Sequence, residues 1–374
     1  MARRLTFIAA LMLHAMAAGA SSAQVQPASK AVDSVVAALA GGLVERGECA
    51  GIAIGIDHGG EHGFYPYGSV EHGTGRLSTP TTEFEIGSIT KVFTTTLLAL
   101  YAHRHQVKLD AALQNYVPPG ITVPSFSGRR ITLVELATHT SGLPRVPPIH
   151  GESYASSDMF AFLGAYRLPR APGTRYEYSN LGVALLADAL AKATGVPWET
   201  LLERDITSKL GMSDTGLKLN VEQRSRLAIG YNAAGVRAKE NMPTWPAFNG
   251  AGALFSTVDD MRRFLAWNMG EVKSDLNDLL EDLHKPRFAL PRGGAAMGLA
   301  WHILPLERPG LSIVWKNGQT LGYASYIGFV TGAKSGIVIL ANSAKCPVTR
   351  VGTQILGTLS GQASAPIENL EEGK

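Results

Sequence analysis

Ser88 and Lys91 are the first residues whose types and spacing suggest chemistry. They form the pattern Ser-Ile-Thr-Lys at the start of a long apolar segment, and Ser88 is the only serine with a lysine three positions on. Residues three apart on a helix share a face, so Lys91 can reach the Ser88 hydroxyl. A serine hydroxyl becomes a nucleophile when a base takes its proton, and a buried lysine can be that base. In the alternative interpretation, Ser88 caps the helix and Lys91 is solvated.

Two further polar sets could face the same cleft. Tyr178 and Asn180 lie just before an apolar helical run, where a tyrosine can relay a proton and an asparagine can bind an amide. Lys316-Asn317-Gly318-Gln319 ends a predicted strand, where the lysine offers a positive charge and the glycine permits close backbone approach. The structural alternatives are a helix cap at Ser179 or Asn180 and a solvated lysine in an Asn-Gly hairpin turn.

The elements that would position these residues are strands at both chain ends and helices between them. Short connections near the C-terminus indicate an antiparallel meander. We predict an α/β unit built from 24–95 and 250–374, a helical insertion over 96–249, and a mobile tail from Ser360. The predicted strands are 51–57, 63–70, 298–304, 311–317, 324–329 and 335–341, and the clearer helices are 31–44, 88–105, 133–138, 154–166, 180–194, 198–205 and 349–359.

The first residues are typical of an export signal. Arg3 and Arg4 precede an apolar run, and small residues lead to a cleavage site after Ala23. The run is short for a membrane span, so we expect residues 1–23 to be removed and the protein to be periplasmic rather than membrane-anchored. The formal net charge of the 374 residues is +3, and loss of the two arginines brings it to +1.

Composition and missing motifs exclude several function classes. A chain that is 45% hydrophobic and 17% charged is globular, and without a cluster of Lys and Arg it is not expected to bind nucleic acid. His103 and His105 do not share a helix face, and H-E-x-x-H does not occur, so we expect no metal and no cofactor. The absence of G-x-S-x-G disfavours an α/β-hydrolase. His139 is assigned only a turn-organising role.

Together the three polar sets resemble the motifs of the penicillin-binding protein and serine β-lactamase superfamily. Its S-x-x-K, Y-x-N and K-T-G motifs read S-I-T-K, Y-S-N and K-N-G here, in the same order. The likeness extends from about Gly51 to about Leu356 and points to the class C branch. Residues 124–145 are most similar to AmpH-type penicillin-binding proteins, which are periplasmic D-alanyl-D-alanine carboxypeptidases/endopeptidases. The resemblance implies a β-lactamase/DD-peptidase fold, with an antiparallel sheet flanked by helices.

The resemblance also implies a role for each residue. Ser88 would form an acyl-enzyme, with Lys91 and Tyr178 handling the protons and the choice of general base left open. The backbone N–H groups of Ser88 and Gln319 would form the oxyanion hole. The substrate-binding set would be Asn180, Lys316, Asn317, Gly318, Gln319 and Arg350.

The chain departs from the family motifs in two places, and the resemblance implies that its two cysteines pair. Asn317 stands where the family usually has threonine, and the asparagines usual before Arg350 are missing from 343–349. Both changes weaken the expectation of tight carboxylate recognition and of an efficient β-lactamase. In the implied fold the first and last strands are neighbours, so we predict a Cys49–Cys346 disulfide.

The leading hypothesis is therefore a periplasmic serine DD-peptidase acting on peptidoglycan peptides. The alternatives are a class C-like β-lactamase acting on β-lactams, a promiscuous esterase on the same scaffold, and a non-catalytic binding protein. The sequence indicates no oligomeric state.

Overall fold

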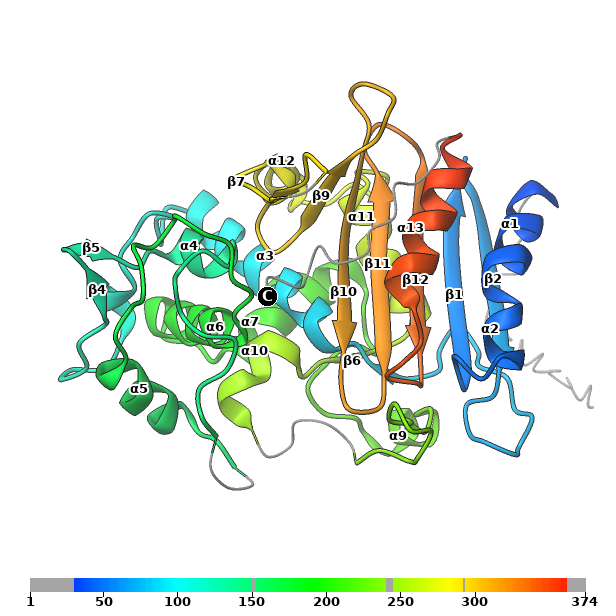
Figure 1. Cartoon of the computed structure of the whole chain (residues 1–374), viewed down its shortest axis with the longest axis horizontal. Helices are drawn as coiled ribbons and strands as arrows, with labels where there is room; N and C mark the ends of the chain where they lie inside the picture. The colour runs from blue at the N-terminus through cyan, green and yellow to red at the C-terminus, as the bar shows by residue number, and fades with distance from the viewer. Residues whose placement is uncertain (1–29, 150–152, 240–244, 292, 362–374) are drawn as a thin grey trace, which may run out of the picture.

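The computed structural model describes residues 30–149, 153–239, 245–291 and 293–361. Its largest element is an eight-stranded antiparallel sheet with the order β2-β1-β12-β11-β10-β9-β8-β7, as the sequence predicted in outline (Figure 1). The strands are β1 (Gly51–His58), β2 (Glu61–Gly68), β7 (Phe288–Ala289), β8 (Ala296–Met297), β9 (His302–Pro305), β10 (Ser312–Gln319), β11 (Ala324–Val330) and β12 (Ser335–Ala341).

Strands from the two ends of the described chain pair near the β2 edge of the sheet. β1 pairs with β12, and Ile54 lies opposite Ile339. Every residue of β11 and β12 is buried, which explains why both segments are almost continuously apolar: each face of the sheet is covered. β2 lies at the edge and contains Pro66, a residue that edge strands tolerate because they need not donate every ladder hydrogen bond.

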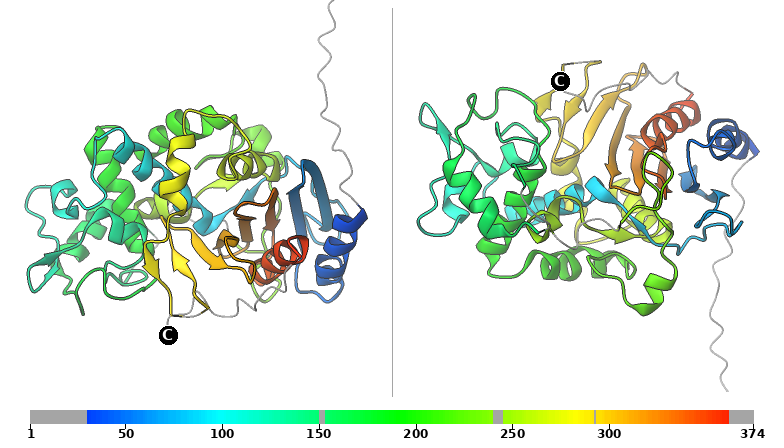
Figure 2. Two further views of the ribbon diagram at one scale, coloured as in Figure 1. Left: turned by 90° about the horizontal axis from the view of Figure 1, so that it is seen from above. Right: turned by 60° about the horizontal axis from the view of Figure 1, so that its bottom comes forward.

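Helices from both chain ends cover the sheet. α13 (Val348–Leu359) packs on β10, β11 and β12 and contacts α1 (Lys30–Ala40), which is followed by the short α2 (Gly42–Glu45). α11 (Val258–Asn268) packs on β1, β11 and β12 from the opposite face, and the view from above separates it from α13 (Figure 2). Two hydrophobic cores result, one on each face of the sheet.

A helical region lies beyond the β9 side of the sheet (Figure 1). At its centre α3 (Thr90–His103) packs against α6 (Asn180–Thr194) and α10 (Asn249–Gly252), and α3 is buried from Thr90 to Tyr101. The other α-helices of the described residues are α4 (Leu133–Ala137), α5 (Ser156–Ala165), α7 (Trp198–Leu202), α8 (Ser208–Leu210), α9 (Val221–Ser225) and α12 (Leu280–His284). Two small sheets pair β3 (Phe84–Glu85) with β6 (Phe255–Ser256) and β4 (Ser125–Phe126) with β5 (Arg129–Arg130).

A disulfide joins the chain segments that flank β1 and β12, which are neighbours in the sheet. Cys49 precedes β1 and Cys346 follows β12, and the structure joins them with their Cα atoms 4.7 Å apart. This is the pairing that the resemblance implied. Both cysteines are buried in the core between the sheet and α13.

The predicted elements differ from the structure in instructive places. The strand predicted over 298–304 is wrong in its first half, because Gly298 donates to the carbonyl of Trp301 in a tight turn and β9 begins at His302. The helix predicted from Ser88 begins as a 3₁₀ turn, Gly87–Ile89, before α3. The proposed limits of the helical insertion, 96 and 249, fall inside α3 and at the start of α10.

Some expectations concern segments outside the described residues. These are the export signal at 1–23 and all but the first two residues of the tail from Ser360. None of the described helices is long and apolar enough to cross a membrane.

Candidate active site

Ser88 and Lys91 meet at the start of α3. Ser88 lies on the 3₁₀ turn Gly87–Ile89, and its side chain is half-buried, so a substrate can reach it. Lys91 is fully buried one turn later, and its Nζ atom donates to Ser88 Oγ at 2.9 Å and to the carbonyl oxygen of Ala251 at 2.5 Å. The helix thus holds the Lys91 side-chain nitrogen directly against the serine hydroxyl, as the spacing predicted.

Tyr178 approaches the same hydroxyl from the segment just before α6. Its OH donates to Ser88 Oγ at 2.7 Å. Tyr178 is held there because Ser179 caps α6, its Oγ accepting from the N–H of Gly182 at 2.8 Å and donating to the carbonyl oxygen of Pro144 at 2.7 Å. Asn180 is the first residue of α6, and its side chain is half-buried. The helix cap and the functional arrangement, which the sequence presented as alternatives, therefore occur together.

Three cations surround the Tyr178 ring. Lys91 Nζ lies 5.1 Å from the ring centroid, Lys316 Nζ lies 4.9 Å away, and Arg145 Cζ lies 4.9 Å away. Lys316 is fully buried in β10, whereas Arg145 is exposed. Positive charge beside a phenol favours its phenolate form. The arrangement can therefore move a proton between Ser88 and either of its two neighbours.

Gly318 and Gly87 bring β10 up to Ser88. A Cβ atom at Gly318 would lie 2.1 Å from the carbonyl oxygen of Ile86 and 2.9 Å from the Ser88 nitrogen. Gly87 has a φ of +49°, and a Cβ there would lie 2.8 Å from the Gln319 nitrogen. Only glycine allows this approach. The backbone nitrogens of Ser88 and Gln319 consequently lie close together, where paired N–H groups can bind an oxyanion.

Asn317 and Arg350 lie apart from this cluster. Alternation along β10 turns Asn317 toward α13, where its Nδ2 donates to Thr349 Oγ1 at 2.9 Å. The guanidinium of Arg350 is about half exposed and donates to a Glu48 carboxylate oxygen at 3.1 Å. The Gln319 side chain donates to the carbonyl oxygen of Ala344 at 2.8 Å, which leaves only its backbone at the site. The structure thus brings together Ser88, Lys91, Tyr178 and Lys316, and it holds Arg350 in an ion pair elsewhere.

His139 is a residue whose importance the sequence analysis underestimated. Its Nδ1 accepts from the N–H of Ser179 at 3.2 Å, its carbonyl oxygen accepts from the N–H of Glu177 at 2.8 Å, and its ring lies 4.4 Å from that of Tyr178. Burial, with the charges of Lys316 and Lys91, lowers the pKa of His139 well below 6.5. A neutral imidazole therefore supports residues 177–179, which we call the Tyr178 loop. The Thr-His-Thr-Ser-Gly run was a signal for this role.

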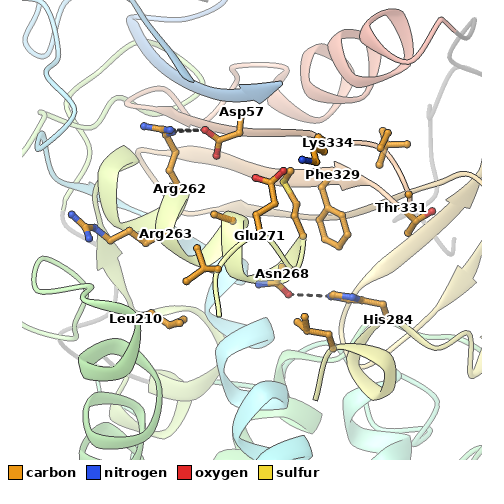
Figure 3. Close-up of a pocket in the computed structure, with 18 of the residues that line it drawn as sticks. Asp57, Leu210, Arg262, Arg263, Asn268, Glu271, His284, Phe329, Thr331 and Lys334 are labelled. Carbon is orange, nitrogen blue, oxygen red and sulfur yellow. Dashed lines mark hydrogen bonds and ion pairs between the residues drawn. The ribbon is translucent and has the colours of Figure 1, made fainter. Parts of the chain in front are cut away.

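A separate cavity of about 1320 Å³ lies on the α11 side of the sheet. Figure 3 shows Arg262 turned toward Asp57 and Asn268 turned toward His284, from α11 and α12. The lining of this cavity includes none of the residues around Ser88. In the described parts of the chain, no cluster of His, Cys, Asp and Glu side chains has a geometry that could hold a metal ion.

Comparisons with known proteins agree with this geometry. The β-lactamase family model matches residues 36–356. The chain is 32% identical over 319 residues to the D-alanyl-D-alanine-carboxypeptidase/endopeptidase AmpH of Escherichia coli strain K12, covering 80% of each protein. It is 28% identical to a β-lactamase of Pseudomonas fluorescens, covering 80% of this chain and 90% of that protein. A solved class C β-lactamase superimposes with a TM-score of 0.78 at 28% identity, covering 88% of this chain and 96% of that one. The chain therefore belongs to the β-lactamase family of serine hydrolases.

Proposed function

We propose that this protein is an exported DD-carboxypeptidase/endopeptidase that cleaves D-alanine-containing peptides of peptidoglycan through an acyl-enzyme at Ser88. The observation that carries the proposal is the pair of contacts at Ser88 Oγ, 2.9 Å from Lys91 Nζ and 2.7 Å from Tyr178 OH. One hydroxyl within hydrogen-bond distance of two proton-transfer groups is the arrangement that activates a serine.

The reaction begins with loss of the Ser88 proton. Once the site has lost one proton, either the Lys91 amine or the Tyr178 phenolate can accept the proton from Ser88 as Oγ attacks the carbonyl carbon. The resulting oxyanion would lie between the N–H groups of Ser88 and Gln319. The same proton then passes to the leaving amine as the peptide bond breaks, and water hydrolyses the ester.

The other residues would bind the substrate. Lys316 places a buried positive charge beside Tyr178, 4.9 Å from its ring. Asn180, at the first position of α6, is the amide that would hold the backbone of the substrate. A peptidase is favoured because the AmpH relative reaches 32% identity. An export signal at 1–23 would place the enzyme in the periplasm, where such peptides occur.

A class C-like β-lactamase is the second candidate, because a class C β-lactamase superimposes with a TM-score of 0.78. The ion pair between Arg350 and Glu48 does not separate the two candidates, because penicillins and D-Ala-D-Ala peptides both carry a carboxylate next to the bond that is cleaved.

Two assays separate the candidates. The peptidase releases D-alanine from an acyl-L-Lys-D-Ala-D-Ala peptide with multiple turnovers, and nitrocefin gives only a burst equal to the enzyme concentration. Sustained nitrocefin turnover without D-alanine release would contradict the proposal and favour the β-lactamase. Turnover of p-nitrophenyl esters alone would favour an esterase. Ser88→Ala serves as the control in each assay.

A further inference from the structure

The segment that contains Arg145 is fixed to the Tyr178 loop. The carbonyl oxygen of Arg145 accepts from the N–H of Asn180 at 2.8 Å and from that of Leu181 at 3.3 Å. The preceding carbonyl, of Pro144, accepts from Ser179 Oγ at 2.7 Å. These three contacts bind the start of α6 to the backbone of Pro144 and Arg145. The start of the Arg145 side chain therefore has a defined place beside the Ser88 cluster.

The guanidinium of Arg145 lies over the Tyr178 ring and remains open to solvent. Its Cζ atom is 4.9 Å from the ring centroid. Two other arginines near this loop pair with carboxylates, Arg170 with Glu177 at 2.6 Å and Arg129 with Glu135 at 2.8 Å. Within the described ranges no carboxylate is paired with Arg145. A cation stacked on an aromatic ring keeps its edge N–H groups available for an anion.

The place that the resemblance assigned to carboxylate binding is occupied differently. Arg350 donates to Glu48, and Asn317 donates to Thr349. Both side chains already have protein partners near α13. Arg145 is thus the exposed guanidinium that the structure places against the phenol bonded to Ser88. A guanidinium binds a carboxylate through two parallel hydrogen bonds, which fixes orientation as well as affinity.

We propose that Arg145 binds the carboxylate of the substrate at the Ser88 site and so selects acyl donors that carry a free carboxylate beside the scissile bond. The inference rests on the proposed function, because it requires acylation of Ser88. It assigns to Arg145 the recognition role that the resemblance gave to Arg350.

The test compares substrates that differ only in this charge. Benzylpenicillin is paired with its methyl ester, and the acyl-D-Ala-D-Ala peptide is paired with its C-terminal amide. Acylation of Ser88 by the penicillins is followed by intact mass, and kcat/KM is measured for the peptides. The variants are Arg145→Gln, Arg145→Lys and, as a matched control, Arg130→Gln at an exposed arginine of β5.

The expected result is selective. Arg145→Gln lowers acylation by the carboxylate-bearing member of each pair by about tenfold or more, mainly through KM, as expected for the loss of a charge-assisted hydrogen bond. Acylation by the neutral member changes less than about threefold, Arg145→Lys lies between the two, and Arg130→Gln matches the wild type. Equal losses on both members, or no loss on either, overturn the inference and leave the proposed function standing.

Failure of the proposed function has a different signature. In that case wild-type protein forms no Ser88 adduct with either penicillin and releases no D-alanine from the peptide. That outcome overturns the proposed function and the inference together.

Discussion

Buried ionisable side chains have different partners in two regions of the molecule. One region is the Ser88 cluster, formed by Ser88, Lys91, Tyr178 and Lys316, and the other is the cavity beside α11. Lys91 is fully buried, and the contacts of its Nζ atom include the Ser88 hydroxyl and the carbonyl oxygen of Ala251. Asp57 is equally buried beneath the α11 cavity, but its Oδ1 accepts from the Arg262 guanidinium and from His62. Removing an ion from water costs several kcal/mol unless an opposite charge or strong hydrogen bonds compensate it. We infer that the first arrangement serves reactivity and the second serves stability.

The largest expected effect is the loss of activity on removing the Ser88 hydroxyl. Ser88→Ala should lower D-alanine release by about 10³-fold or more, because the nucleophile is gone and only binding and oxyanion stabilisation remain. The side chain is small and half-buried, so the melting temperature should stay within about 2 °C of that of the wild type. Residual activity within tenfold of the wild type would contradict the assignment.

Breaking the ion pair between Asp57 and Arg262 should have the opposite effect, because it should lower stability and leave activity unchanged. Asp57→Ala leaves the buried side of Arg262 without its carboxylate, and we expect a loss of about 3–5 kcal/mol in the free energy of unfolding, measured with urea. Activity per folded molecule should not change, since Asp57 lies outside the Ser88 cluster. Asp259→Ala is the matched control, because its pair with Arg263 is exposed and should contribute less than about 1 kcal/mol. If Asp57→Ala lost activity but not stability, the inference that Asp57 serves stability would be wrong.

Removing the disulfide, like removing the Asp57 carboxylate, should lower stability without affecting activity. Cys49→Ser together with Cys346→Ser should lower the free energy of unfolding by about 2–5 kcal/mol, since the bridge closes a loop across 297 residues, and leave Ser88 chemistry intact. In wild-type protein, intact mass should rise by the mass of two hydrogen atoms on reduction. No mass change on reduction would disprove the bridge.

Glu83 extends the comparison to a buried carboxyl that is kept neutral. Burial, with a contribution from Asp214, raises the pKa of Glu83 from 4.5 to about 9. Between these values the folded protein keeps the proton that the unfolded chain releases, so the wild type loses stability as pH rises through this window. Glu83→Gln stays neutral, so its advantage in the free energy of unfolding should grow from pH 5 to pH 8 by about 1 kcal/mol per pH unit.

The control for this effect is Glu222→Gln, at an exposed glutamate of α9. It should show no such trend. A difference between Glu83→Gln and the wild type that does not vary with pH would mean that folded Glu83 is ionised.

Periodicity predicted the regular elements well because their burial is regular. The predicted ranges of β12 and α6 coincide with those of the structure, since one is a continuous buried run and the other an apolar helix between a serine cap and a C-terminal glycine. β9 was predicted to begin four residues early, because the turn at 298–301 contains apolar residues that resemble a strand. Ala300 has a φ of +61° there, a conformation that the residue type does not indicate.

Motif spacing identified the cluster but not its surroundings. Ser88, Lys91, Tyr178 and Lys316 could be named from the sequence because each lies in a short pattern with a chemical meaning. Arg145 could not, and the Thr-His-Thr-Ser-Gly run drew attention to His139 without indicating its role, because both roles depend on contacts with residues 177–181, more than 30 residues further on in the chain. Arg350 was expected at the site, but its orientation depends on Glu48, which lies 302 residues away in the sequence.

The most direct test of the central claim is the fate of Ser88 when the protein meets benzylpenicillin. Wild-type protein is mixed with an excess of the drug, sampled over time, digested and mapped by mass spectrometry. We predict one covalent penicilloyl group, located on Ser88, that forms in step with the loss of D-alanine release and persists far longer than a β-lactamase intermediate would. Ser88→Ala should carry none. An adduct on another residue, or full inhibition without any adduct, would contradict the assignment of Ser88 as the nucleophile.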